Sequence, residues 1–470
     1  MTFDMLADDV LLEIFDFYVK EQRIQMWVRL AHVCRRWRNV VFQSPHRLDL
    51  RLICTESTPT RNTLDIWPRL PLIIISGYSG YVNNTGLDNL IAALEHNDRV
   101  CRIEFNNFSS RPPRAVTESA AMQKPFPQLT DLRICNVLGW ERPIRPIPNS
   151  FLGGSAPHLR SLYLDGTTFP GLVPNLLLSA THLVHLELNR IPSTGYIPPE
   201  AIATSLTALT SLELLRLHFQ DPRPRPALES RRPPPPPQTR STLPTLTKIR
   251  FQGVSEYLEG ILARIDAPRL NELDITFFNQ IIFGTPQLFQ FISRRPTLSA
   301  PEEGHIVFNS SAIFVRFPSQ TPDSGTLGVR ILCTTSEWQL SSLEQVCTSS
   351  LPPFPTLEDL YIFEDLYFPP CWQDDIENTL WQELLQPFAA VKNLYLCKKV
   401  MPRIAPALQE LVGGRATEVL PNLEKCFLEE FLPTGPLHEG IEKFVAARRF
   451  AGHPFTVSRW DRDWRRNPST

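Results

Sequence analysis

The fold of this chain is decided by the segment LTDLRI at residues 129–134, where apolar residues occupy the first, fourth and sixth places. The same apolar-x-x-apolar-x-apolar pattern starts at residues 100, 129, 159, 183, 212, 246, 270, 357, 391 and 423. Most steps between these starts are 24 to 34 residues. Apolar residues that alternate with polar ones favour a short half-buried strand. The sequence therefore predicts a repeat array with one strand in each unit.

The motif and its step resemble leucine-rich repeats, which stack a short parallel strand and a returning helix or loop in each unit. Polar residues flank the apolar ones, as Asp131 and Arg133 do around Leu132. One face of the sheet is therefore expected to be solvated, as on the concave side of a horseshoe. A closed βα barrel is the alternative, but barrel strands are buried on both faces and have continuous apolar runs. We expect an α/β fold with an open, irregular solenoid.

The period fails between residues 270 and 357. Segments 305–308, 312–317 and 329–332 have the composition of strands. We expect two or three irregular repeats there, with strands in place of helices as returning segments. Earlier strands are predicted at 48–52 and 71–75, and helical returns at 86–95 and 372–388.

The first forty-odd residues have a different period. Large apolar residues fall at positions 6, 10, 11, 14 and 15, and again at 30, 33, 34, 37, 40 and 41. Both sets have the spacing of one helical face. Two or three short helices cannot bury all of this apolar surface among themselves. The apolar surface that the helices leave exposed predicts that this segment binds a partner protein.

This segment resembles the F-box, a short helical module. The resemblance covers residues 5–48 and rests on Leu6, VLLEIF at 10–15, LAHVCRRW at 30–37, Pro45 and Leu48. One departure is Ala7, since the family usually has proline there. The resemblance implies binding to the Skp-type adaptor of cullin-RING ubiquitin ligases. The residues implied in adaptor binding are Leu6, Val10, Leu11, Ile14, Phe15, Leu30, Val33, Cys34 and Trp37.

These patterns divide the chain into three regions. We expect an F-box-like helical module over 1–47, a leucine-rich-repeat solenoid over 48–435 and a C-terminal cap and tail over 436–470. A proline-rich insertion over 221–242 interrupts the solenoid. It contains the spacing Arg231-x-x-Pro234-x-x-Pro237, which polyproline-binding grooves recognise, but we interpret it as an insertion loop. The whole layout resembles the large F-box/repeat families of mushroom-forming fungi.

Composition narrows the possible functions. A net charge of −2 provides no global field for nucleic acid or an anionic membrane. The sequence predicts neither a signal peptide nor a membrane-spanning run. The nine cysteines are scattered without a Cys-x-x-Cys pair, so we expect reduced thiols, no metal site and a cytoplasmic or nuclear location. No catalytic motif or cofactor motif is present, and the chain is not expected to be an enzyme.

These observations together predict a substrate-recognition subunit of a cullin-RING ubiquitin ligase. A protein-binding scaffold without a ligase role is the first alternative, and an enzyme on a βα barrel is the second. Strand alternation selects candidate residues for target binding. These are Arg133, Tyr163, His185, Glu187, Asp274, Tyr361 and Tyr395, with Asp131, Ser161, Glu272, Asp359 and Asn393 beside them.

Overall fold

The computed structural model describes residues 6–21, 27–45, 47–76, 83–106, 116–135, 147–167, 172–221, 240–279, 283–319, 325–372, 376–411, 415, 417–429 and 436–460. Most of the predicted proline-rich insertion and the end of the tail lie outside these ranges. The chain divides into two units, residues 1–212 and 213–470. Each unit is described by itself.

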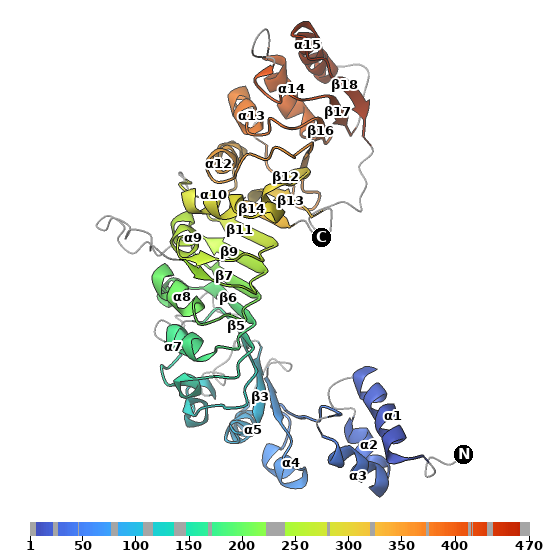
Figure 1. Cartoon of the computed structure of the whole chain (residues 1–470), viewed down its shortest axis with the longest axis vertical. Helices are drawn as coiled ribbons and strands as arrows, with labels where there is room; N and C mark the ends of the chain where they lie inside the picture. Colours follow the sequence, from blue (N-terminus) through green and yellow to red (C-terminus); the bar gives the residue numbers. More distant parts are fainter. Residues whose placement is uncertain are drawn as a thin grey trace. The chain divides into compact units, whose positions relative to one another are not determined.

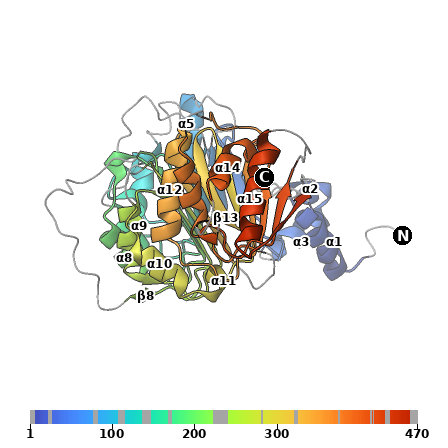
Figure 2. The ribbon, with the colours of Figure 1, turned by 90° about the horizontal axis from the view of Figure 1, so that it is seen from above.

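Three helices form a small module at the start of the first unit (Figures 1 and 2). They are α1 (Asp8–Glu21), α2 (Trp27–Val33) and α3 (Arg35–Gln43). Cys34 separates the last two helices, and its sulfur accepts a hydrogen bond from the Trp37 amide at 3.4 Å, which caps α3. The buried Trp27 donates through its indole nitrogen to the Arg51 carbonyl at 3.1 Å. This bond joins the module to the first repeats.

The remainder of the first unit is a parallel sheet in chain order. Its strands are β1 (Leu52–Cys54), β2 (Leu72–Ser76), β3 (Val100–Phe105), β4 (Asp131–Cys135), β5 (Ser161–Asp165) and β6 (His185–Ile191). The returning segments are α4 (Thr60–Ile66), α5 (Asn84–Leu94), α7 (Leu172–Ser179) and α8 (Pro199–Leu206), with short turns η2 (Ala120–Gln123), η3 (Phe151–Gly154) and η4 (Ser193–Gly195). The strand expected at 71–75 is confirmed. The one expected at 48–52 is wrong, because residues 47–49 form a turn and β1 begins only at Leu52.

The second unit contains a larger sheet with mixed strand directions. In spatial order its strands are β7 (Leu214–Phe219), β9 (Lys248–Gly253), β11 (Glu272–Phe277), β14 (Thr326–Leu332), β13 (Ala312–Phe317), β12 (Glu303–Asn309), β15 (Asp359–Glu364), β16 (Asn393–Leu396), β17 (Lys425–Leu428) and β18 (Thr456–Arg459). A separate pair joins β8 (Ser241–Thr242) to β10 (Ile265–Asp266). The helices are α9 (Ser255–Leu262), α10 (Pro286–Ser293), α11 (Pro296–Ser299), α12 (Ser336–Ser349), α13 (Asn378–Leu385), α14 (Met401–Gln409) and α15 (Pro436–Phe450).

The chain reverses its order in the middle of this sheet. After β11 it skips two strand positions to place β12, returns through the antiparallel β13, and reaches β14 beside β11. Strands were correctly expected at 305–308, 312–317 and 329–332, but the expectation that they act as returning segments is wrong. All three lie in the main sheet. Their side chains explain this, because β12 and β13 are buried along almost their whole length and need cover on both faces.

The core lies between the sheet and the helices. In the first unit, Leu132, Leu162 and Leu186 are fully or nearly fully buried and stand in register on β4, β5 and β6. In the second unit, α9, α10, α12 and α13 lie along one side of the sheet (Figure 1), and the view from above also shows α9, α10 and α12 on one side (Figure 2). In each unit, we call the side of the sheet that the helices cover the helix face and the opposite side the strand face.

The side chains of the repeat units alternate between the two faces of the sheet, as the motif predicts. Apolar motif positions point to the helix face, and the residues between them point to the strand face. Within the described ranges, neither sheet closes into a ring. The fold is therefore an open α/β solenoid of leucine-rich-repeat type, not a βα barrel. The helix at 436–450 and β18 continue the stack at its C-terminal end.

Candidate interaction surfaces

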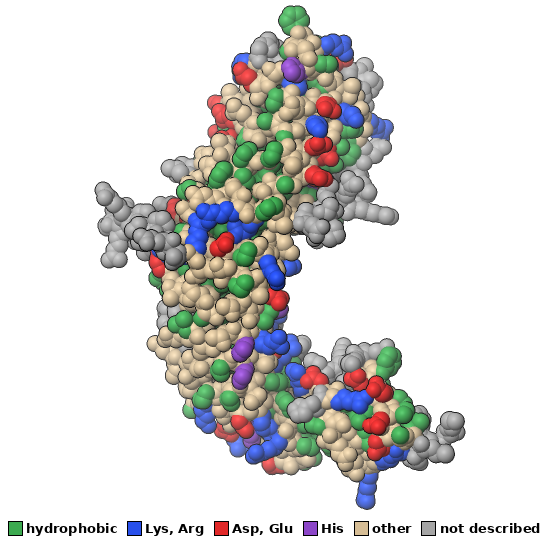
Figure 3. Space-filling model, viewed as in Figure 1, with side chains coloured by type: hydrophobic (Ala, Val, Ile, Leu, Met, Phe, Trp, Pro, Cys, Tyr) green, Lys and Arg blue, Asp and Glu red, His purple; other side chains and the backbone are tan. Residues whose placement is uncertain are grey.

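The helical module exposes large apolar side chains in a row on α1. Val10, Ile14 and Phe17 are 45%, 42% and 64% exposed. Their spacing of four and three residues places them on one side of the helix. Val33 at the end of α2 is 59% exposed. Hydrophobic and acidic side chains lie together on this module in Figure 3. Apolar rows of this kind on a small module mark interaction sites.

The other predicted adaptor-binding residues have mixed positions. Leu11, Phe15 and Leu30 are buried inside the module, where they hold the helices together. Trp37 is half-buried, and its ring lies 4.8 Å from the Phe15 ring. Leu6 is also half-buried, and Cys34 is exposed. The adaptor contacts of all these residues stay a prediction. Phe17 was missed, although its spacing of three residues from Ile14 was visible in the sequence.

On the strand face of the first unit, the predicted target-binding residues form cross-strand pairs. Arg133, Tyr163 and Glu187 are register partners on β4, β5 and β6. The Arg133 guanidinium lies 4.4 Å from the centre of the Tyr163 ring. Partial burial raises the pKa of the Tyr163 phenol, with a further contribution from the nearby Asp165. His185 is exposed at the start of β6, two residues before Glu187, and is the register partner of Ser161.

Ion pairs satisfy much of the charge on this face. Arg190 donates to Asp165 at 2.5 Å, and Arg102 forms an ion pair with Glu104. The hydrogen bond and the Asp165 charge raise the pKa of Arg190 further above its ordinary value. The first unit thus presents alternating, paired charges.

The C-terminal part of the second unit has an aromatic row on its strand face. The Tyr361 and Tyr395 rings stack at 4.1 Å, and Tyr395 and Phe427 stack at 4.5 Å. Trp460 covers this stack, with its ring 5.8 Å from Tyr361 and 5.6 Å from Tyr395. Burial raises the pKa of Tyr361. His305 packs against Tyr361 at 4.9 Å and extends the row.

His305 has an unusual environment for a strand-face residue. It is 5% exposed, and its Nε2 atom is hydrogen-bonded to Glu303, which is also buried. Its Nδ1 atom has no hydrogen-bond partner among the described residues. The pair is part of the double-sided burial of β12.

The N-terminal part of the second unit's strand face is basic. Arg216, Arg250, Asp274, Gly328 and Arg316 are register partners on five adjacent strands. Burial opposes the charge of Glu272, but hydrogen bonds from Lys248 and Arg250 outweigh it and lower the pKa of this carboxyl. Arg330 is exposed on β14, and its guanidinium lies 5.0 Å from the centre of the Phe314 ring.

Asp274 stands among these cations without bonding to them. Its carboxylate makes no hydrogen bond to the described residues, although Arg330, Arg250 and Arg316 are close enough to act on it electrostatically. The side chain reaches solvent, yet the neighbouring strands crowd it. This partial removal from water raises its pKa, against the opposing effect of the three arginines.

Several of these residues were missed by the sequence analysis. Phe427 and Arg250 occupy the same motif position as Tyr395 and Arg133, so alternation alone was sufficient to identify them. Arg316 and Arg330 lie in the region without the motif, and only the strand order places them beside Asp274. Trp460 comes directly after a strand that was not matched to the repeat.

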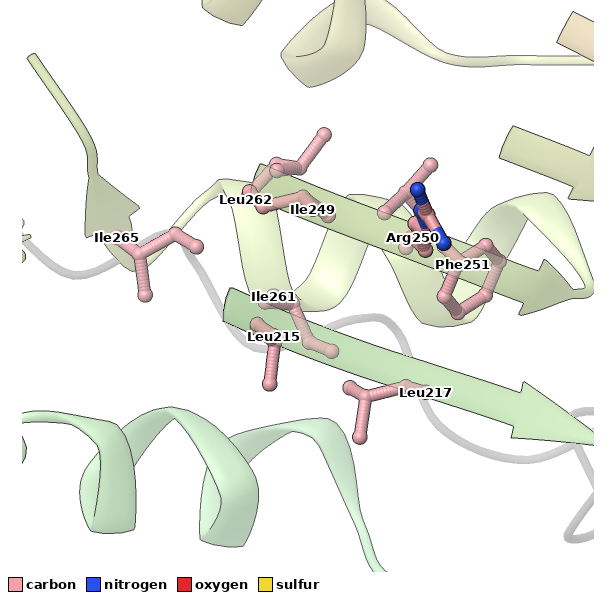
Figure 4. A pocket seen from close by; sticks show the side chains of 9 residues that line it. Leu215, Leu217, Ile249, Arg250, Phe251, Ile261, Leu262 and Ile265 are labelled. Atoms are coloured by element: carbon pink, nitrogen blue, oxygen red, sulfur yellow. The ribbon is translucent and has the colours of Figure 1, made fainter. Parts of the chain in front are cut away.

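Two cavities lie among the described residues of the second unit. One of about 10 Å³ lies between β7, β9 and α9 and is lined mainly by leucine and isoleucine side chains (Figure 4), so it is a packing void of the core. Another of about 250 Å³ lies on the helix face beside Phe289, Leu351 and Phe388. Among the described residues, no cluster of three or more metal-ligating side chains is found.

None of the described helices has the length and apolar character needed to cross a bilayer. All nine cysteines are free thiols, and Cys34 and Cys371 are the exposed ones. Burial raises the pKa of Cys54 to about 11 and of Cys333 to about 12, which keeps these thiols protonated at neutral pH.

Neither a protein-family model nor a curated protein matches the sequence. Among solved structures, the chain is similar to the leucine-rich repeat-containing protein LegL7 from Legionella pneumophila. The identity is 12%, the match covers 84% of this chain and 97% of the other, and the TM-score is 0.27. A likeness at this TM-score adds no weight, so the assignment of an open leucine-rich-repeat-type solenoid depends on the strand pairing described above.

Proposed function

We propose that this chain is a substrate-recognition subunit of a cullin-RING ubiquitin ligase. In this proposal α1–α3 bind the Skp-type adaptor, and the strand face of the repeat body binds a protein target. The observation that carries it is the exposed row of Val10, Ile14 and Phe17 on a module whose sequence resembles the F-box. The exposure of these apolar side chains to water is unfavourable in free energy. Packing against the apolar surface of a partner protein would bury them.

The proposed role is positional, not chemical. The chain holds a target near the ubiquitin-loaded enzyme, and so raises its effective concentration there. Catalysis belongs to other subunits, and we propose neither an enzymatic activity nor a cofactor for this chain. The free thiols fit a reducing compartment, so we propose a cytoplasmic or nuclear location.

Co-purification of the full chain with the Skp-type adaptor tests the proposal. The variant Val10→Asp, Ile14→Asp places two charges on the exposed row without touching the buried Leu11. The matched control is Ile66→Asp, because Ile66 is 76% exposed on α4, outside the module. We expect a stoichiometric complex with the parent and the control but not with the double variant. Absence of a complex with the folded parent would refute the ligase role.

A protein-binding scaffold without an adaptor is the second candidate. Ala7 favours it, since the F-box pattern usually has proline at this position. If the parent chain is folded, fails to bind the adaptor and still captures a protein through its strand face, this candidate replaces the first.

A further inference from the structure

The strand face of β7, β9, β11, β14 and β13 has an excess of positive charge. On this face, the described residues of these strands carry five cationic side chains and two carboxylates, those of Glu272 and Asp274. We call the five cationic side chains the basic patch. Lys248 and Arg250 form ion pairs with Glu272, so the imbalance is a surplus of cationic over acidic side chains on these strands and does not require unpaired groups. The basic patch consists of Arg216, Lys248, Arg250, Arg316 and Arg330.

From this patch we infer that the second unit binds an extended acidic peptide segment of its protein partner, with carboxylate side chains on the arginines. The inference rests on the proposed function in one respect, namely that the strand face binds a protein target. It adds the chemical class of the bound segment.

Spacing favours a run of carboxylates over a single phosphate group. Arg250 and Arg316 are three strand positions apart, which corresponds to roughly 14 Å at the usual strand separation. In an extended peptide, every second side chain points to the same side, at intervals of roughly 7 Å. Carboxylates at alternate positions therefore match the spread of the cations. One phosphate would meet only part of this charge, and it would face the Asp274 carboxylate between the arginines.

The patch has room for such a segment. Gly328 stands between Asp274 and Arg316 in the register, and a Cβ atom there would lie 3.3 Å from Asp274 Oδ1. Asp274 therefore leans over a position without a side chain. Arg330 is exposed, and its described contact is the Phe314 ring, so its guanidinium can form ion pairs with a ligand.

The aromatic row indicates which residue types the segment carries after its acidic run. Tyr361, Tyr395 and Phe427 occupy the same strand-face position on β15, β16 and β17, beyond β12 in the same sheet. Tyr361 is buried and Trp460 lies against Tyr361 and Tyr395, so a segment that crosses the strands from the basic patch would next meet the half-buried rings of Trp460 and Phe427. Apolar side chains after the acidic run suit that surface.

Fluorescence anisotropy with the full chain tests the inference. The probe is a labelled peptide of about 14 residues in which four glutamates alternate with serines and a Leu-Phe pair comes after them. One comparison peptide has glutamines in place of the glutamates. A second has the glutamines and a single phosphoserine. We expect the glutamate peptide to bind at least tenfold more tightly than the glutamine peptide, and more weakly as the salt concentration rises.

Matched variants locate the site. Arg316→Glu, Arg330→Glu should weaken binding of the glutamate peptide by about tenfold or more, because two attractive charges become repulsive. The control Lys443→Glu, Arg449→Glu makes the same charge change on the exposed surface of α15 and should leave binding unchanged. Asp274→Asn removes a repulsive carboxylate and should tighten binding about threefold. Circular dichroism shows whether each variant is folded.

Several results would overturn the inference. They are equal binding of the glutamate and glutamine peptides, tighter binding of the phosphoserine peptide, and unchanged binding by the folded arginine variant. Failure of the parent chain to bind any of the peptides would also overturn it. Adaptor co-purification is measured on the same preparation. A chain that binds the adaptor but not the glutamate peptide contradicts only this inference, and the reverse result contradicts only the ligase role.

Discussion

The regular repeats β4–β6 and the reversed segment β12–β14 use neighbouring strands in opposite ways. In the regular repeats, burial alternates along β5 and through the motif positions of β4 and β6, and the chain order equals the spatial order. In the reversed segment, β12 and β13 are buried along nearly their whole length, and the order is inverted. Where the repeat period holds, it identifies the residues that lie on the strand face. Where the period is lost, β12 and β13 are buried on both faces.

The largest loss of stability should come from a substitution of a buried residue in the reversed segment. Phe308 on β12 is fully buried, with its ring 5.0 Å from Trp372 and 5.5 Å from Trp381. Phe308→Ala should lower the free energy of unfolding of the second unit by about 3–5 kcal/mol, because it leaves a large cavity. Urea denaturation monitored by hydrogen exchange in that unit measures this loss. Phe17→Ala, which removes an exposed ring, should cost less than about 0.5 kcal/mol.

A smaller effect should arise where β14 begins beside β11. A Cβ atom on Gly325 would lie 2.7 Å from the Asn271 carbonyl oxygen and 2.8 Å from a Leu298 methyl group. Gly325→Ala should therefore cost about 1–3 kcal/mol of stability through backbone displacement. Gly284→Ala is the matched control, since nothing lies within 4 Å of the added atom. Equal melting temperatures for the two variants would contradict the close packing of β14 against its neighbours.

The aromatic row should contribute more to stability than the Arg133–Tyr163 contact of the regular repeats. Tyr395 stacks between Tyr361 and Phe427, whereas Tyr163 in the regular repeats has an arginine above its ring. Tyr395→Ala should cost about 1–2 kcal/mol, because it removes two ring contacts and the burial that they provide. Arg133→Ala should cost about 0.5 kcal/mol. Chemical denaturation compares them, and the reverse order would mean that the stack adds little stability.

The smallest effect concerns pH. The pKa of Asp274 lies above its ordinary value of 3.8, so the folded chain keeps this proton to higher pH than the unfolded chain does. The resulting contribution to stability is present below 3.8 and is lost as the pH rises through the folded-state pKa. Asp274→Asn removes this dependence. Measured across this pH range, the variant should gain in stability relative to the parent as the pH rises, and a relative loss would contradict the direction of the shift.

Much of the sheet was predictable from local pattern. The motif located β3–β7, β9, β11 and β15–β17, because each pairs in the same direction with the same apolar positions toward the core. It did not predict the inversion of β12–β14. An apolar run shows that a strand is buried but not which neighbours it pairs with. That order depends on long-range pairing, such as His305 opposite Arg316.

The residues of the candidate surfaces were predictable from the sequence where the repeat motif is present. Arg133, Tyr163 and Tyr395 were identified from alternation, and the structure places each on a strand face. The excess of arginines around Asp274 was not predictable, since Arg316 and Arg330 come from strands outside the period. In the helical module, helical spacing identified the apolar residues but not which of them face inward. Only packing distinguishes the buried Leu11 from the exposed Val10.

Isothermal titration of the full chain with purified Skp-type adaptor tests directly whether the helical module binds this partner. We expect a one-to-one complex for the parent and for Ile66→Asp. For Val10→Asp, Ile14→Asp we expect a dissociation constant about 100-fold higher or more, since two side chains of the proposed interface become charged. Equal affinity of the double variant and the parent, or no binding by the folded parent, would contradict the proposed binding.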